Sequence, residues 1–126
     1  LLAEDNDLNA EIAIELLTRE GLLVERANDG VACLEMLQKA PEDYYDLILM
    51  DIQMPIMDGY KATRAIRRFL DKKKAAIPIV AMTANAFTED RERALEAGMN
   101  DHVAKPIDMK VLMNVLEEQI CGRKGS

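Results

Sequence analysis

Short apolar runs alternate along the chain with stretches in which apolar residues recur every three or four positions. The runs have the length of strands and cover residues 1–3, 22–24, 47–50, 77–82 and 102–104. Uninterrupted apolar runs of this kind are typical of parallel strands that are covered on both faces. The sequence therefore predicts five parallel strands.

The stretches between the runs predict amphipathic helices, because apolar residues three or four positions apart share one helix face. Leu8, Ile12 and Leu16 have this spacing, as do Ile66 and Leu70, and Leu112, Val115, Leu116 and Ile120. Gly21 and Gly98 stand where helix C-caps are expected, and Asp58 and Asp108 where N-caps are expected. Five successive strand-helix units predict a doubly wound α/β fold with right-handed crossovers.

The length of 126 residues fits one domain, and a composition that is 49% hydrophobic can build a core. We expect the domain to span residues 1–121, with residues 122–126 as a linker or tail. The chain starts abruptly within an apolar run, so the first strand is expected to have lost residues upstream.

The charge of the chain narrows the classes of partner. With 23 acidic and 16 basic residues, the net charge of −7 repels phosphate backbones and anionic lipid, so direct binding of nucleic acid or membrane is not expected.

The two cysteines show no sign of a metal site or a disulfide bond. Cys33 and Cys121 lie far apart, without metal-ligand spacing, and no secretory signal precedes them. Two reduced thiols in a cytoplasmic protein are expected.

Polar side chains follow four of the predicted strands. Glu4 and Asp5 follow the first strand, Asp51 the third, Thr83 the fourth and Lys105 the fifth. Because parallel strands end at one edge of a sheet, where ligands bind, these groups are expected to converge. Converging carboxylates repel each other, so a cation is needed to stabilise their ionised forms.

Mg²⁺ fits this need, because it binds one or two carboxylates together with waters and phosphate oxygens. A metal beside a carboxylate, a hydroxyl and an ammonium group indicates phosphoryl transfer, in which the protein positions the phosphoryl group and neutralises its charge. Asp51 would be the nucleophile, Lys105 and Mg²⁺ would hold phosphoryl oxygens, and Thr83 would donate to a third oxygen. No general base is required, because an ionised carboxylate is already nucleophilic.

Four motifs, "AEDN", "LILMDIQMPIMDG", "MTANA" and "GMNDHVAKPI", resemble the receiver domain of two-component response regulators over nearly the whole chain. The longer stretch "MTANAFTEDRERALEAGMNDHVAKPI" is most similar to receivers of hybrid sensor histidine kinases. This similarity implies a cytoplasmic domain, either separate or as the cytoplasmic part of a membrane-bound sensor kinase. The resemblance implies a flavodoxin-like five-stranded parallel sheet of order 2-1-3-4-5 with five helices.

The resemblance also implies a role for each residue at the strand ends. Asp51 would be the phosphoacceptor, Glu4 and Asp5 the acidic pair that binds Mg²⁺, Thr83 the switch hydroxyl and Lys105 the phosphate-binding lysine. Asp51 would also be a metal ligand.

Further positions gain a role from the resemblance alone. The backbone carbonyl of Gln53 would be another metal ligand, and the side chains of Gln53 and Asn85 would tune hydrolysis of the phosphoryl group. His102 stands where the family often has an aromatic switch residue, and the Lys105–Pro106 peptide bond would be cis.

In function, the resemblance implies a phosphorelay receiver that takes a phosphoryl group from a histidine kinase's phosphohistidine and catalyses its own phosphorylation and dephosphorylation. It would then act as a conformational switch or pass the group to a histidine phosphotransfer domain. One alternative is a degenerate receiver that serves only as an interaction module. Another is a Mg²⁺-dependent phosphohydrolase with an aspartyl-phosphate intermediate, although Gln53 stands where that class has a second acid.

Structural roles compete with these functional ones. Asp5 or Asn6 could simply cap the first helix, and Asp58 is expected only to cap the third. Met109, Met113 and Phe69 are interpreted as packing residues, and the basic runs Arg64-Arg67-Arg68 and Lys72–Lys74 as a solvated helix face and loop.

Overall fold

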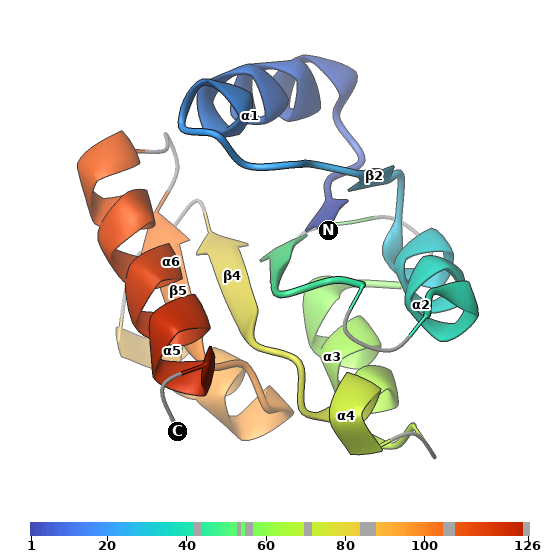
Figure 1. The fold of residues 1–126 in the computed structure, drawn as a ribbon. Helices are drawn as coiled ribbons and strands as arrows, with labels where there is room; N and C mark the ends of the chain where they lie inside the picture. The colour runs from blue at the N-terminus through green and yellow to red at the C-terminus, as the bar shows by residue number, and fades with distance from the viewer. Residues whose placement is uncertain are drawn as a thin grey trace.

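The computed structural model describes residues 1–41, 44–52, 54, 57–69, 72–83, 88–104 and 108–124, and only the backbone of residues 88–91 and 120–124. The described strands are β1 Leu2–Ala3, β2 Arg26–Ala27, β3 Ile48–Asp51, β4 Ile79–Thr83 and β5 Asp101–Ala104. The helices are α1 Asp7–Arg19, α2 Gly30–Lys39, α3 Gly59–Arg67, α4 Lys72–Ala75, α5 Thr88–Ala97 and α6 Met109–Lys124 (Figure 1).

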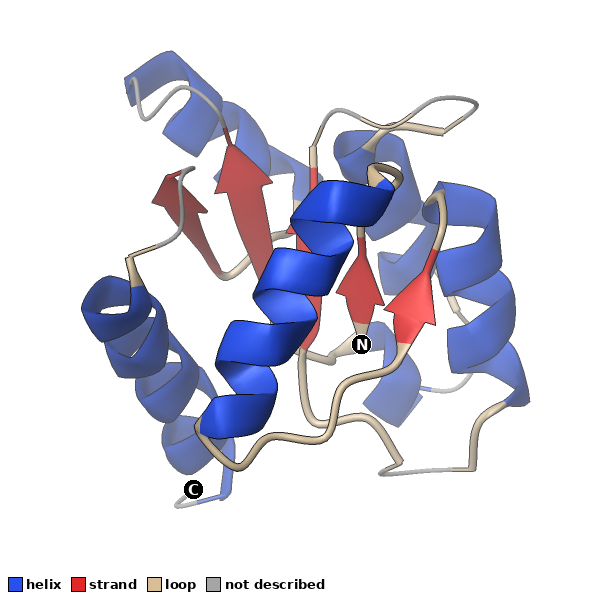
Figure 2. Ribbon diagram, turned by 90° about the horizontal axis from the view of Figure 1, so that it is seen from above, coloured by secondary structure: helices blue, strands red, loops and turns tan. Residues whose placement is uncertain are grey.

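The strands form one parallel sheet in the order β2-β1-β3-β4-β5, which confirms the predicted topology. In Figure 2 the strand arrows point the same way, so their carboxyl ends share one edge. The described part of the chain has six helices instead of the predicted five, because α4 adds a single turn before β4. Its residues Lys72 and Lys73 are exposed, whereas Lys74 Nζ donates to the carbonyl of Gln38 at 2.8 Å.

Helices cover both faces of the sheet, as the uninterrupted apolar strands predict. Successive strand residues point to opposite faces. Ile48 and Met50 pack in a core with α2, α3 and α5, while Leu47 and Leu49 pack in a second core with α1 and α6. The predicted packing roles of Met109, Met113 and Phe69 are confirmed, because all three lie against these cores.

Helix α1 forms where predicted, but the predicted buried face is wrong. Leu8 is 65% exposed and Ile12 is 50% exposed, whereas Ala10, Ala13 and Leu17 are buried against the sheet. Ala10, Ala13 and Leu17 pack in the core with Leu2 and Leu49, and this tertiary contact decides which face of the helix is buried. The larger apolar side chains of Leu8 and Ile12 are left in solvent.

The second strand was also misplaced. It lies at Arg26–Ala27 instead of residues 22–24, because the backbone of β1 bonds to this later segment: Leu2 N donates to Glu25 O at 2.8 Å and Glu4 N donates to Ala27 O at 3.1 Å. Leu22 and Val24 instead pack against the core beside α1 and α6. Their apolar pattern therefore reflects side-chain packing, not strand pairing.

The helix caps confirm the local predictions. Gly21 and Gly98 have φ values of 86° and 106°; Gly21 follows Glu20, the C-cap residue of α1, and Gly98 follows α5 directly. Asp58 accepts from Lys61 N at 2.9 Å and caps α3, and Asp108 accepts from Lys110 N at 2.9 Å at the start of α6.

Arg67 has a structural role that contradicts its predicted place on a solvated face. Its half-buried guanidinium donates to the carbonyls of Gly98, Ala75 and Ile77 at 2.7 to 2.9 Å and to Asn100 Oδ1 at 2.8 Å. Arg64 and Arg68 are exposed, as predicted. Arg67 thus joins the end of α3 to the segments that enter β4 and β5.

Three further features bear on the predictions from the sequence. Cys33 is free and buried in the core, and burial raises the pKa of its thiol to about 12. Helix α6 continues to Lys124, past residue 121. In the described part of the chain, no helix is both long and apolar enough to cross a bilayer.

Candidate functional site

Three carboxylates meet at the carboxyl edge of the sheet. Asp51 ends β3, Glu4 follows β1, and these strands are neighbours whose register pairs Ala3 with Met50. Glu4, Asp5 and Asp51 each offer an oxygen atom, and these oxygens all lie within 4.8 Å of one another. The structure thus brings together the three acidic side chains that the sequence predicts.

The donor set fits a hard divalent cation. Glu4 is 2% and Asp51 is 4% exposed, while Asp5 is exposed at the mouth of the cluster. Ligand oxygens around an octahedral Mg²⁺ are about 3 to 4 Å apart, so the observed separations require little adjustment. Buried carboxylates this close together repel unless a positive charge compensates them, which also favours binding of a cation.

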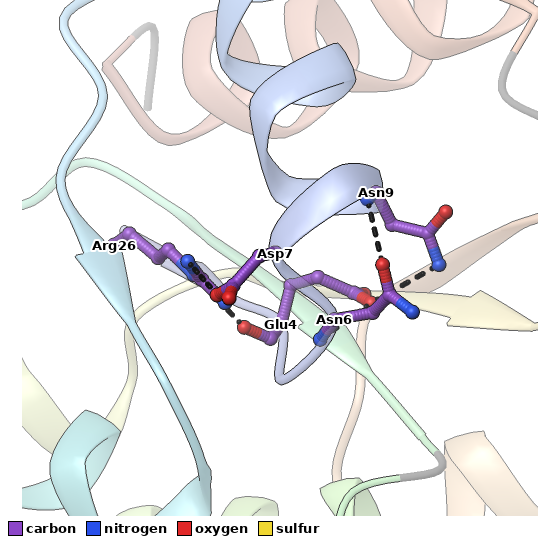
Figure 3. Close-up of polar contacts among 5 residues, drawn as sticks. All are labelled: Glu4, Asn6, Asp7, Asn9 and Arg26. Atoms are coloured by element: carbon purple, nitrogen blue, oxygen red, sulfur yellow. Dashed lines mark hydrogen bonds and ion pairs between the residues drawn. The ribbon is translucent and has the colours of Figure 1, made fainter.

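The first turn of α1 holds this acidic loop. Asn6, not Asp5, caps the helix, because Asn6 Oδ1 accepts from Asn9 N at 3.0 Å. Glu4 Oε1 accepts long contacts of 3.4 Å from Asn6 N and Asn9 Nδ2 (Figure 3). The cap role is therefore taken by Asn6, and the carboxylate of Asp5 is not used for it.

Gly59 allows α3 to begin directly against the strand that carries Asp51. A Cβ atom at Gly59 would lie 2.7 Å from the carbonyl oxygen of Asp51 and 2.9 Å from the Cα of Ile52. Gly59 N also donates to Ile52 O at 2.9 Å. This role was not predicted from the sequence, although glycine is the residue that allows such a close approach of two backbone segments.

Thr83 is buried at the end of β4, next to the acidic cluster in the sheet. The register pairs Asp51 with Met82 and Thr83 with Ala104, so Thr83 extends one position beyond the Asp51 level on the neighbouring strand. Lys105 follows Ala104 directly in sequence.

The roles of the remaining predicted site residues stay predictions. Lys105, Pro106, Gln53 and Asn85 lie outside the described residues, so their roles and the cis peptide bond stay predictions. His102 lies half-buried in β5, paired with Ala81, and its Nδ1 is 3.7 Å from Asp101 Oδ1. Its switch role also stays a prediction.

Arg26 contacts the acidic turn, a role that was not predicted from the sequence. Its Nε donates to the Glu4 carbonyl at 3.1 Å, and its Nη1 is 2.8 Å from Asp7 Oδ1. No local sequence pattern indicates this role. The strand that carries Arg26 was predicted at residues 22–24, and the partners of Arg26, Glu4 and Asp7, lie in a distant part of the chain.

Comparison with known proteins gives consistent matches. The family model of the response regulator receiver domain matches residues 1–117. The chain is 44% identical over 123 residues to hybrid signal transduction histidine kinase I of Dictyostelium discoideum and 44% identical over 123 residues to histidine protein kinase 1 of Candida albicans. These matches cover 96% and 92% of this chain but only 7% and 5% of the relatives' lengths.

Solved structures agree with these matches. The receiver domain of a sensor histidine kinase from Pseudomonas aeruginosa, with a magnesium ion in its active site cleft, is 39% identical with a TM-score of 0.83, covering 94% of this chain and 93% of that one. The receiver domain of Ssk1 from Saccharomyces cerevisiae, in complex with the histidine phosphotransfer protein Ypd1, is 27% identical with a TM-score of 0.83, covering 97% and 88%.

Proposed function

Because this chain belongs to the response regulator receiver domain family, we propose that it is a phosphorelay receiver whose Asp51 accepts a phosphoryl group in a Mg²⁺-dependent reaction. The observation that carries this proposal is the meeting of Glu4, Asp5 and Asp51 within 4.8 Å at the carboxyl edge of the sheet. The similarity to receiver regions of hybrid histidine kinases supports a phosphohistidine as the donor.

In the proposed reaction, an ionised oxygen of Asp51 forms a bond to the phosphorus as the bond between phosphorus and the donor's imidazole nitrogen breaks. The electron pair of the broken bond stays on that nitrogen, and the imidazole leaves as the neutral ring because its other ring nitrogen carries a proton. Glu4, Asp5 and Asp51 would hold Mg²⁺, which when bound supplies positive charge toward the phosphoryl oxygens. Thr83 would donate its hydroxyl hydrogen to one of these oxygens, and Lys105 would pair with another.

The phosphoryl group would then pass to a histidine phosphotransfer domain or bias a conformational equilibrium. The yeast complex supports the first route, because a related receiver domain is bound there to a histidine phosphotransfer protein. A switch requires that partners bind the two states with different affinity. All three carboxylates of the cluster are present, which argues against a degenerate receiver that serves only as an interaction module. We also propose that the domain is located in the cytoplasm.

The proposal is tested by intact mass measurement after incubation with acetyl phosphate, with Mg²⁺ or with EDTA. We expect a single phosphoryl adduct with Mg²⁺, labile to hydroxylamine, and at least about a tenfold smaller yield in EDTA, because removing the ion leaves the carboxylates to repel the donor. A histidine kinase carrying phosphohistidine serves as a second donor in parallel. No adduct from either donor, with folded protein that binds Mg²⁺, would contradict the proposal and favour an interaction module.

The exposed side chains on α1 support a docking surface for the phosphotransfer partner. Leu8 and Ile12 lie one helical turn apart and are exposed, and Leu8 follows Asp5 by only three residues. Exposed apolar side chains that adjoin a reactive site are typical of an interaction surface. We propose that a histidine phosphotransfer domain contacts these two residues as its histidine approaches Asp51.

Substitution of Leu8 by glutamate should therefore slow phosphoryl transfer between Asp51 and a histidine phosphotransfer protein by about tenfold or more, since a buried apolar anchor in an interface contributes on the order of 2 kcal/mol. Labelling by acetyl phosphate should be unchanged, because this small donor needs no docking surface. Leu95→Glu is the matched control, because Leu95 is exposed on α5, which covers the other face of the sheet. Equal transfer rates for Leu8→Glu and Leu95→Glu would contradict this docking surface.

A further inference from the structure

The side chain of Arg26 links the edge strand β2 to the acidic turn between β1 and α1. Arg26 pairs with Leu2 in the sheet, two residues before Glu4, and its side chain extends forward toward the carboxyl edge. Figure 3 shows it reaching from β2 to Glu4 and Asp7. One nitrogen, Nε, donates to the Glu4 carbonyl at 3.1 Å, and another, Nη1, is 2.8 Å from Asp7 Oδ1.

These two contacts flank Asp5, the exposed member of the carboxylate cluster. One contact holds the backbone just before Asp5, and the other holds the turn two residues after it. An exposed turn loses conformational entropy when a ligand orders it, so a turn that is already held binds with less cost. We propose that Arg26 is a positioning residue for the metal site, which orders residues 4–7 so that Glu4 and Asp5 face the cation together. This inference rests on the proposed Mg²⁺-dependent function.

A positioning role and a purely electrostatic role predict opposite effects. If Arg26 acted only through its charge, it would repel a divalent cation, and its removal would strengthen metal binding. If it acts by ordering the turn, its removal weakens binding. The contact geometry supports ordering, because Nε bonds a backbone carbonyl and not a ligand carboxylate.

The guanidinium is poorly explained by a role in fold stability alone. Its Nη2 atom is buried and has no hydrogen-bond partner among the residues that the structure describes, and its charged partner Asp7 is exposed. Buried donors without partners and ion pairs with exposed groups contribute little or unfavourably to stability. A lysine at this position would keep the charge. It would remove the unpartnered Nη2 and could not contact the Glu4 carbonyl and Asp7 through two separate nitrogen atoms.

The test compares the parent chain with Arg26→Lys, Arg26→Met and the control Arg19→Lys, whose arginine is exposed on α1 and pairs only with Glu15 among the described residues. The Mg²⁺ dissociation constant is measured by NMR titration well below the unfolding temperature, and amide exchange of residues 5–9 is measured in EDTA. We expect Mg²⁺ binding about tenfold weaker in both Arg26 variants, and faster exchange without metal, with Arg19→Lys unchanged.

Two results would overturn the inference while leaving the proposed function intact. Unchanged Mg²⁺ binding in Arg26→Lys together with tighter binding in Arg26→Met would mean that Arg26 acts only through charge. Unchanged amide exchange at residues 5–9 in both Arg26 variants would mean that the turn is ordered without this side chain. A parent chain that binds no Mg²⁺ at millimolar concentration would instead overturn the proposed function, and with it the inference. Amide exchange in EDTA would still show whether Arg26 orders residues 5–9.

Discussion

Asp51→Asn should abolish the phosphoryl adduct completely with either acetyl phosphate or a phosphohistidine donor. The amide has nearly the shape of the carboxylate but lacks the ionised oxygen that would attack phosphorus. The variant should still fold, because it removes one of three carboxylates that lie within 4.8 Å of one another and so relieves repulsion in EDTA. The measurement is intact mass after labelling, with thermal unfolding in EDTA to show that the fold is kept.

Asp58→Asn is the matched control for this result. Asp58 is another aspartate of the same motif, but its carboxylate caps α3 through Lys61 N, and asparagine is an equally good cap. Labelling of Asp58→Asn should therefore match that of the parent chain. An adduct of normal yield on Asp51→Asn would show that another side chain accepts the phosphoryl group, and the assignment of Asp51 would be wrong.

Arg67→Met should reduce the free energy of unfolding by about 3 kcal/mol. The substitution keeps the aliphatic stem and a similar helix propensity, so the loss comes from the hydrogen bonds of the guanidinium. Those bonds reach the carbonyls of Gly98, Ala75 and Ile77 and the side chain of Asn100, which also accepts from Ile79 N. Without Arg67, several partly buried acceptors lose their donor together.

Arg64→Met controls for the loss of charge from the same helix. Arg64 is exposed, so its replacement should change the free energy of unfolding by no more than about 0.5 kcal/mol. Urea unfolding of the three proteins, monitored by circular dichroism, measures both effects. A difference of less than about 1 kcal/mol between the two variants would contradict the structural role of Arg67.

The edge of the sheet that carries the acidic cluster could be predicted from sequence, because all parallel strands end at the same edge. All parallel strands end on one side, so acids after the first and third strands must approach each other when those strands are neighbours. The structure confirms the strand order and brings Glu4, Asp5 and Asp51 together. The caps at Asn6 and Asp58 are local as well, because each bonds a backbone amide three residues ahead.

The two wrong predictions, the buried face of α1 and the position of β2, share a different cause. The buried face of α1 depends on the fit of Ala10 and Ala13 to the sheet, and hydrophobicity alone favoured Leu8 and Ile12. The position of β2 depends on which backbone segment pairs with β1. An apolar pattern reports burial, and it cannot say whether a residue is buried by strand pairing or by side-chain packing.

The sequence by itself determined the class of fold, the alternation of strands and helices and the acidic residues at the strand ends, because these follow from patterns within short windows and from the parallel arrangement. Only the tertiary structure decided the roles of Arg26 and Arg67. Their partners lie far away in the chain, at Glu4 for Arg26 and at Gly98 and Asn100 for Arg67. A long cationic side chain looks the same in sequence whether it is solvated or joins distant segments, because the acceptors that distinguish the two are assembled only when the chain folds.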